Sequence, residues 1–300
     1  MRINDAHCHF FSRRFFEVLA RDDPKGRFAA NAPESICSTL GWDPPGDNTQ
    51  LAGRWVKALD ESNVARAVLI GSVPGEEDSV AEAIAHAPDR LVGYFMVNPL
   101  ADDAPARVER GLGTLGLKGV CLFPAMHRYH LEDTRSLAVI ARVASYPGAV
   151  LFVHCGALTV GVRKRLGLRS RFDVRFGNPL DLHHIASEYP AMPIVVPHFG
   201  AGLLREALML ADLCPNVHLD TSSSNHWVAY HPELTLTAVF RQALDLLGPT
   251  RLLFGTDSSF FPRGWNRPVL DAQTGILESL NVSAPDRALM LGGNFDRLFS

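Results

Sequence analysis

Pro193-Ile194-Val195-Val196-Pro197-His198 is a short apolar run that ends on an ionisable side chain. Its β-branched residues favour a buried strand, and residues 203–213 then show the three- and four-residue apolar spacing of an amphipathic helix. Similar pairs of strand and helix recur along the chain. The expected strands are Arg2–His7, Val64–Gly71, Leu91–Val97, Leu117–Phe123, Ala149–His154, Pro193–His198, Asn216–Asp220 and Arg251–Thr256. The expected helices are Leu51–Ser62, Ser79–Ala87, Ala104–Leu112, Thr134–Ala144, Asp181–Glu188, Leu203–Leu213 and Leu234–Leu247.

This alternation predicts an α/β fold with parallel strands. Eight such units close most simply into a (β/α)8 TIM barrel, here a single domain over residues 1–300. A doubly wound open sheet is the alternative, but no strand leads into the glycine-rich fingerprint of a dinucleotide site. The connections at residues 10–50 and 155–178 are longer than a barrel needs, and both follow strand C-termini. We therefore expect them to be lids or binding loops.

Composition excludes several classes of protein. The chain has 29 Lys and Arg against 32 Asp and Glu, a net charge of −3, which argues against binding nucleic acid by phosphate neutralisation. The start of the chain lacks the apolar core of a signal peptide, and no uncharged run suits a membrane span. Five cysteines without a CxxC spacing fit reduced thiols. We expect a cytoplasmic protein that acts on a small molecule, forms a homo-oligomer (a dimer as first guess), and binds neither nucleic acid nor membrane.

Ionisable side chains gather where the predicted strands end. His7 and His9 in Asp5-Ala6-His7-Cys8-His9 point the same way, because successive strand side chains alternate between faces. His154, His198 and Asp257 each follow an apolar strand, so they converge on the same barrel mouth. Several histidines and one carboxylate around an open position suit zinc or a similar divalent ion that activates water.

These motifs resemble the amidohydrolase superfamily, in particular its amidohydrolase-related branch, which is similar to aminocarboxymuconate-semialdehyde decarboxylase. The resemblance covers nearly the whole chain. It is carried by Asp5-Ala6-His7-Cys8-His9, Gly116-Leu117-Lys118-Gly119-Val120, Phe152-Val153-His154, Pro197-His198-Phe199-Gly200-Ala201-Gly202, Leu253-Phe254-Gly255-Thr256-Asp257 and Leu291-Gly292-Gly293-Asn294.

The resemblance implies that His7, His9, His154 and Asp257 hold one divalent metal ion, Zn²⁺ first and Mn²⁺ as the alternative. It also implies that His198 acts as an acid/base beside that ion, with Asp257 as a second catalytic residue. Larger members bridge two metals with a lysine at the end of strand four. Here Lys118 stands near the beginning of that strand, which favours one ion.

The loops beyond the strands supply candidate substrate contacts. Arg263 is a candidate carboxylate clamp and Trp265 a candidate apolar wall, while Ser222 and Asn225 after strand seven are candidates to line the pocket. Six positive side chains fall within residues 163–175. They either form a solvated loop or attract an anionic substrate.

Two reactions fit this machinery. A hydrolase would add water to a lactone, ester or amide of a small carboxylated substrate, and we favour that reading. A nonoxidative decarboxylase of an aromatic or muconate-type acid is the alternative, and a metal-free or noncatalytic relative is the third.

Overall fold

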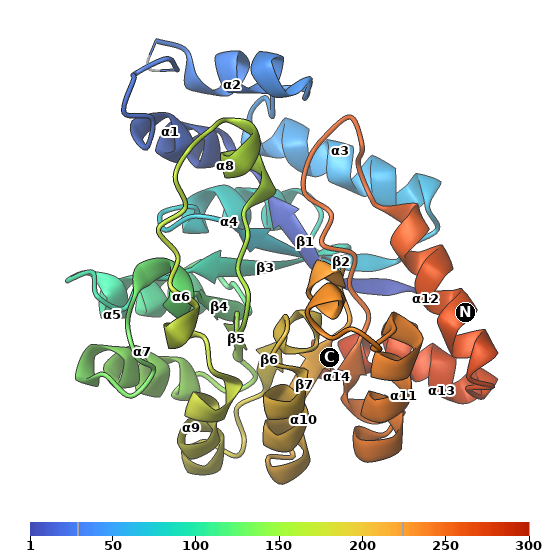
Figure 1. Ribbon diagram of the computed structural model, residues 1–300. Helices are drawn as coiled ribbons and strands as arrows, with labels where there is room; N and C mark the ends of the chain where they lie inside the picture. The colour runs from blue at the N-terminus through green and yellow to red at the C-terminus, as the bar shows by residue number, and fades with distance from the viewer. Residues whose placement is uncertain (29, 224, 300) are drawn as a thin grey trace.

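The computed structural model describes residues 1–28, 30–223 and 225–299. Eight parallel strands follow one another in chain order around a sheet, with helices outside, so the predicted TIM barrel is confirmed (Figure 1). The strands are β1 (Asn4–Phe10), β2 (Arg66–Gly71), β3 (Leu91–Met96), β4 (Gly119–Leu122), β5 (Val150–Val153), β6 (Ile194–Val196), β7 (Val217–Asp220) and β8 (Leu252–Leu253). Each lies within two or three residues of its predicted start.

The helices follow the predicted apolar periodicity closely. Those around the barrel are α3 (Asn48–Glu61), α4 (Glu77–His86), α5 (Ala104–Glu109), α7 (Thr134–Ala144), α9 (His183–Glu188), α10 (Leu204–Leu213), α11 (Leu236–Leu247) and α12 (Arg267–Ser279). Short helices α6 (Pro124–His127), α13 (Ala284–Ala288) and α14 (Asn294–Leu298) complete them. The predicted helix at Asp181–Glu188 begins at His183, because Pro179–Leu182 forms a 3₁₀ turn first. No helix of the described ranges is long and apolar enough to cross a membrane.

The barrel closes through the chain on either side of β8. Ala6 N–H donates to Phe254 O at 2.9 Å, and Asp257 N–H donates to His7 O at 2.9 Å. His9 N–H then donates to Ser258 O at 2.7 Å. Strand β8 itself has only two residues, but these hydrogen bonds extend its parallel pairing with β1 as far as Ser258. The first and last predicted metal-binding segments are therefore hydrogen-bonded neighbours.

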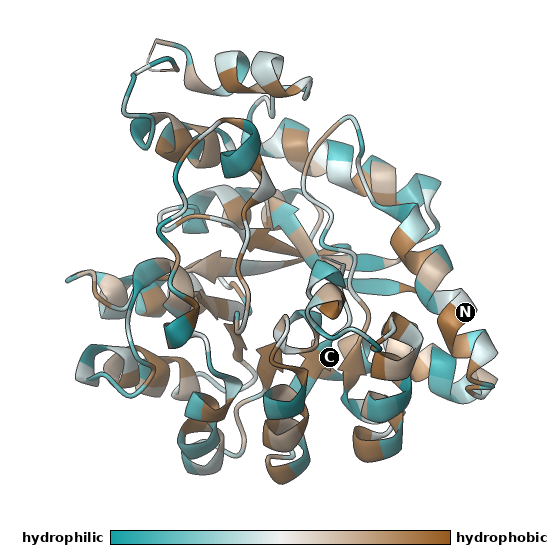
Figure 2. Cartoon of the chain, in the orientation of Figure 1, coloured by the Kyte–Doolittle hydropathy of each residue, from teal (hydrophilic) through white to brown (hydrophobic). Residues whose placement is uncertain are grey.

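Strand alternation separates two apolar layers. In β2, Val68 and Ile70 pack inside the barrel, whereas Ala67 and Leu69 pack against the helices. The central strands from β3 to β6 are accordingly mostly brown in Figure 2, whereas β1, which carries the histidines, is largely teal and the outer helices mix both colours. Phe295 of α14 belongs to the interior cluster, so this C-terminal helix helps to fill the barrel. The barrel is a packed core, and its mouth is left for a site.

A cap built from the two long connections lies beside the mouth. Helices α1 (Arg13–Arg21), α2 (Ala32–Leu40) and α8 (Gly161–Arg165) lie together at the top of Figure 1. They share a separate apolar cluster that includes Phe16, Ile36 and Leu166. Arg165 Nη2 donates to Leu40 O at 2.6 Å, which ties α8 to α2. The expected loops after β1 and β5 are thus one folded cap rather than two independent lids.

We predict that Gly156→Ala destabilises the fold much more than Gly167→Ala. Both glycines have positive φ, near +70° and +67°, so each substitution costs about 1–2 kcal/mol of backbone strain. A Cβ on Gly156 would also lie 2.2 Å from Gly200 O and 2.4 Å from Ala201 O, whereas nothing lies within 4 Å of one on Gly167. We expect a total loss of about 2–5 kcal/mol for Gly156→Ala. Urea unfolding of both variants checks this, and equal midpoints would contradict it.

Candidate active site

His7 and His9 form the centre of the site. Both side chains lie on β1 and their Nε2 atoms are 3.4 Å apart, although a register irregularity interrupts the strand between Asp5 and Cys8. His9 Nε2 lies 3.1 Å from Asp257 Oδ1, and His7 Nε2 lies 3.7 Å from the same oxygen. The ligand atoms of these three residues lie within 4.8 Å of one another. That spacing is small enough for one ion to reach all three.

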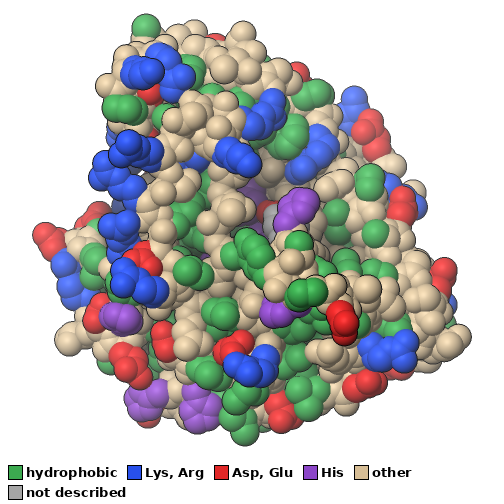
Figure 3. Space-filling view, in the orientation of Figure 1, with side chains coloured by type: hydrophobic (Ala, Val, Ile, Leu, Met, Phe, Trp, Pro, Cys, Tyr) green, Lys and Arg blue, Asp and Glu red, His purple; other side chains and the backbone are tan. Residues whose placement is uncertain are grey.

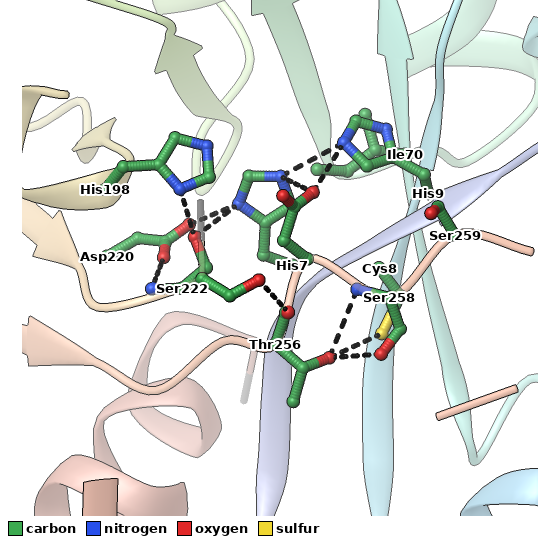
Figure 4. A network of polar contacts seen from close by, with 12 residues as sticks. His7, Cys8, His9, Ile70, His198, Asp220, Ser222, Thr256, Ser258 and Ser259 are labelled. Atoms are coloured by element: carbon green, nitrogen blue, oxygen red, sulfur yellow. Dashed lines mark hydrogen bonds and ion pairs between the residues drawn. The ribbon is translucent and has the colours of Figure 1, made fainter. Parts of the chain in front are cut away.

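The opposite nitrogens of the two imidazoles have their own partners. His7 Nδ1 lies 2.6 Å from Asp220 Oδ2, and His9 Nδ1 lies 2.8 Å from Ser72 Oγ. With a cation bound, a proton on each Nδ1 would satisfy these bonds and leave each Nε2 with a lone pair for the ion. In Figure 4 the His7 ring lies between Asp220 and Ser222 on one side and His9 on the other. This is the arrangement that carboxylate and hydroxyl partners impose on metal-binding histidines.

The electrostatics favour a charged carboxylate facing the rings. Burial opposes the charged form of Asp257, but the hydrogen bond from His9 and the nearby His7 and His198 hold the pKa of its carboxyl far below the ordinary range. Burial likewise opposes a charged His7, yet Asp220 and Asp257 raise its pKa to about 8. A metal cation bound between His7 and Asp257 would take the place of the additional proton that His7 otherwise binds.

Close packing of the last strand brings Asp257 into position. A Cβ on Gly255 would lie 2.9 Å from His7 Cβ and 3.0 Å from Ser222 Cβ, so a glycine is needed for this approach. Asp257 itself has φ of +57°, in the left-handed region that costs a non-glycine residue about 1–2 kcal/mol. Strain of this kind persists where surrounding contacts over-determine the backbone.

His154 and His198 share the same cavity. The ring centroids of His7 and His198 are 5.0 Å apart, and those of His198 and His154 are 5.4 Å apart. His154 stands outside the compact group of three residues, but its buried Nδ1 has no hydrogen-bond partner among the described residues. An orphaned buried imidazole nitrogen beside two facing ones fits a divalent ion as a shared partner.

His198 is buried and held by a hydroxyl. Its Nδ1 lies 2.9 Å from Ser222 Oγ, which is also 3.1 Å from His7 Nδ1. Burial, followed by the charge on His7, lowers the pKa of His198 below its usual value, which favours the neutral ring at neutral pH. The residue has φ of +55° and begins a run of positive φ through Gly202. This turn carries His198 away from the ladder of β6 and into the cavity.

The cavity has a volume of about 610 Å³, with ionisable groups on its floor and aromatic rings on its walls. Trp42 and Phe260 stack at 4.2 Å between centroids, and Arg263 lies 4.4 Å above the Phe260 ring. Arg165 lies 5.7 Å from the Trp42 ring on the cap side. Figure 3 shows this hollow in the face of the molecule, with histidine surface inside it and Lys and Arg side chains along its rim.

The candidate substrate residues occupy different places. Arg263 lines the cavity, whereas Trp265 and Asn225 are not among its lining residues. Trp265 is buried behind the site and its Nε1 donates to Asp5 Oδ2 at 2.7 Å. Asn225 Nδ2 donates to Ser222 O at 3.1 Å. Ser222 is fully buried and contacts the two imidazoles, so its position is that of a support beneath the site.

Residues that sequence patterns did not single out for this site complete it. Asp220 ends β7, as His154 follows β5, and its position after an apolar strand was a usable signal. Ser72 follows β2 in the same way. Arg165 is the basic-loop residue that lines the cavity, because Arg163 pairs with Asp22 and Arg175 pairs with Asp173. Lys164, Arg169 and Arg171 are exposed.

The sequence profile of the Amidohydrolase family matches residues 4–300. Protein fluG of Emericella nidulans is 34% identical over 98 residues, which are 32% of this chain and 11% of that protein, so the chain spans about a tenth of that relative's length.

Solved structures with the same fold are more distant in sequence. 5-Carboxyvanillate decarboxylase LigW of Sphingomonas paucimobilis has a TM-score of 0.65 at 16% identity, covering 99% of this chain and 98% of that one. An amidohydrolase of Burkholderia multivorans with bound zinc has a TM-score of 0.64 at 16% identity, covering 100% and 99%. A probable 2-pyrone-4,6-dicarboxylic acid hydrolase of Acinetobacter baumannii, with citric acid bound, has a TM-score of 0.63 at 16% identity, covering 100% and 99%. At this identity the likeness shows the fold alone.

We predict that Asp220→Asn weakens Zn²⁺ binding by about 10- to 100-fold, because the carboxylate that orients His7 and raises its basicity is lost. Competition with a chromophoric chelator measures the Zn²⁺ affinity. Asp212→Asn is the control, since Asp212 is exposed on α10. Unchanged affinity in Asp220→Asn would show that Asp220 does not support a metal ligand.

Proposed function

This chain belongs to the amidohydrolase family, and we propose that it is a metal-dependent hydrolase of a small carboxylated lactone, ester or amide. The observation that carries this proposal is a carboxylate, Asp257, whose Oδ1 lies 3.1 Å from His9 Nε2 and 3.7 Å from His7 Nε2 in the cavity at the barrel mouth. A base in that position suits the addition of water to a carbonyl carbon.

One divalent ion, Zn²⁺ first and Mn²⁺ as the alternative, is the proposed cofactor. His7, His9 and Asp257 would hold it, with His154 as a fourth ligand whose buried Nδ1 is otherwise without a partner among the described residues. Bound there, the ion would supply Lewis acidity toward a carbonyl and lower the pKa of water toward about 7. Lys118 is exposed immediately before β4 begins, so it does not reach the mouth as a bridge to a second ion.

Two side chains would move the protons. Asp257 would accept a proton from the attacking water, because its carboxylate lies beside the Nε2 atoms of His7 and His9, where that water would be activated. We assign the neutral His198 ring a proton on Nε2, with Nδ1 accepting from Ser222 Oγ. The Nε2–H then donates to the substrate carbonyl oxygen as negative charge develops on it. Both residues have left-handed backbone, with φ of +57° for Asp257 and +55° for His198, and both line the cavity.

Charge at the mouth would select an anionic substrate. Asp257 is the acidic residue among the described lining residues, while Arg165 and Arg263 are lining cations. Arg263 Nη2 lies 3.2 Å from Ser259 Oγ, which holds the guanidinium beside Asp257. A carboxylate of the substrate would pair with this fork, and its apolar body would lie along Trp42 and Phe260.

Nonoxidative decarboxylation is the second candidate. The feature that favours it is the apolar wall of stacked Trp42 and Phe260 with cations at its ends, because such a site desolvates a carboxylate beside a flat ring. His198 would then protonate a ring or alkene carbon as CO₂ leaves. Metal-defined protein incubated with lactones and with aromatic carboxylic acids separates the two: acid release without CO₂ supports hydrolysis, and stoichiometric CO₂ overturns it.

We predict that His9→Ala and His198→Asn fail in different ways. Wild-type protein should hold close to one divalent ion per chain. His9→Ala removes a ligand, so it should lose metal and, as a consequence, activity. His198→Asn should keep metal and fold while turnover falls by about 10²–10⁴-fold, the usual contribution of acid/base catalysis.

Elemental analysis and turnover on the same two preparations make this measurement. Metal-free His198→Asn would mean that the turn after β6 supplies a ligand. Fully active His198→Asn would leave proton transfer to Asp257 alone.

We predict that Arg263→Met lowers kcat/KM by an amount equivalent to about 2–4 kcal/mol, because a charge-assisted contact to the substrate carboxylate is lost. Metal content should not change. Arg169→Met is the matched control, since Arg169 is an exposed cation of the basic loop and is not among the cavity-lining residues. A loss below about threefold in Arg263→Met would remove Arg263 from the site.

A further inference from the structure

Glu76 is a buried carboxylate that the proposed chemistry does not use. It lies immediately before α4 and has no solvent exposure. A carboxyl group in such a place is costly unless donors surround it. The hydrogen bonds that Glu76 accepts offset this cost, and their donors indicate which parts of the chain it holds in place.

Each carboxylate oxygen of Glu76 binds a different loop. Oε1 accepts hydrogen bonds from the backbone N–H of Ser12, at 3.2 Å, and from the Ser12 hydroxyl. Oε2 accepts from the backbone N–H of Ser72 at 2.5 Å and of Val73 at 3.0 Å. Ser12 immediately precedes α1, where the cap begins, and Ser72 follows β2. One side chain therefore joins the start of the cap to the end of a strand.

Ser72, which Glu76 holds through its backbone N–H, also contacts the candidate metal ligand His9. Ser72 Oγ donates to Ile70 O at 3.1 Å, so its lone pairs are available to accept a hydrogen bond. His9 Nδ1 lies 2.8 Å from that oxygen, and its proton completes the bond. On the other side of the same ring, His9 Nε2 lies 3.1 Å from Asp257 Oδ1, where a bound cation would contact both. A displacement of the Ser72 backbone would remove the partner that orients the His9 ring.

We propose that Glu76 is a positioning residue that holds His9 in its metal-binding orientation by fixing the backbone of Ser72. The same carboxylate fixes Ser12, so the cap and the metal site share one anchor. This inference rests on the proposed function only in requiring that His9 binds a divalent ion. Two acceptor oxygens are needed, because three backbone N–H groups and one hydroxyl converge on the group.

The test compares Glu76→Ala with Glu77→Ala. Glu77 is the next residue and is also buried, but its carboxylate binds Arg107 Nη2 at 2.6 Å on the helical side. Both variants should lower the denaturation midpoint of the metal-free protein. Glu76→Ala should also weaken Zn²⁺ affinity by about 10- to 100-fold, as loss of support for a metal ligand does, whereas Glu77→Ala should bind Zn²⁺ as the wild type does.

A double-mutant cycle with Ser72→Ala separates positioning from general destabilisation. Because Glu76 acts on His9 through Ser72, Ser72→Ala should weaken Zn²⁺ binding by itself, and adding Glu76→Ala should weaken it little further. If Glu76→Ala does not fold, Glu76→Gln replaces it, since an amide offers one acceptor oxygen in place of two. Chelator competition on metal-free protein gives each affinity without an enzyme assay.

The outcomes discriminate between the two proposals. Wild-type protein that binds no Zn²⁺ would overturn the metal-dependent function itself. Wild-type binding together with wild-type affinity in the Glu76 variant would overturn the positioning role alone. Equal affinity losses in the Glu76 and Glu77 variants, or full additivity with Ser72→Ala, would also overturn it, because either result reports general destabilisation.

Discussion

The buried carboxylate of Asp5 joins β1 to the segment that follows β8, and the site depends on this closure of the barrel. It accepts hydrogen bonds from the backbone N–H groups of His7 and Thr256, at 2.9 and 3.1 Å, and from the Thr256 hydroxyl at 2.5 Å. Trp265 Nε1 donates to it at 2.7 Å. These donors come from the first strand and from the chain that follows the last one. The carboxylate thus fixes the closure of the barrel where His7 and Asp257 meet.

Left-handed backbone is concentrated at the groups that face the cavity. His198, Phe199, Ala201 and Asp257 all have φ between +44° and +57°. Each costs a non-glycine residue about 1–2 kcal/mol, and the packed barrel beneath them supplies the stability that maintains the strain. The turns bring His198, Ala201 and Asp257 to the cavity, whereas the Phe199 ring packs against Phe240 on the helical side. Preorganisation of this kind is what an electrostatically driven reaction needs.

Each of the two β1 imidazoles is oriented by a hydrogen bond at its Nδ1 atom, but the partner differs between them. Asp220 binds His7 Nδ1 and Ser72 binds His9 Nδ1, so both Nε2 lone pairs face the same space. The charges of Asp220 and Asp257 outweigh the burial of His7 and raise its pKa to about 8. The hydroxyl of Ser72 is neutral, and Glu76 accepts a hydrogen bond from the backbone N–H of the same residue. Glu76 also binds Ser12, immediately before α1, so one carboxylate contacts both the cap and the residue that supports His9.

The sequence by itself determined the barrel and the ends of its strands, because both follow from local rules. Apolar alternation gave the strand positions to within a few residues, and a polar residue directly after an apolar strand marked His154, His198 and Asp257 as facing the mouth. His7 and His9 share a face for the same reason of period two. That these side chains line one cavity could therefore be predicted without coordinates.

Tertiary structure alone decided which polar groups support them. Asp220 and Ser72 lie 213 and 63 positions from the imidazoles that they bind, and no local spacing relates residues across a barrel. The stagger of the strands and the closure of the barrel set those pairings. Trp265 shows the same limit, because its place near Asp257 in the chain suggested a wall of the pocket, whereas the turn between them directs its indole to Asp5. Long-range packing, which periodicity does not encode, made that choice.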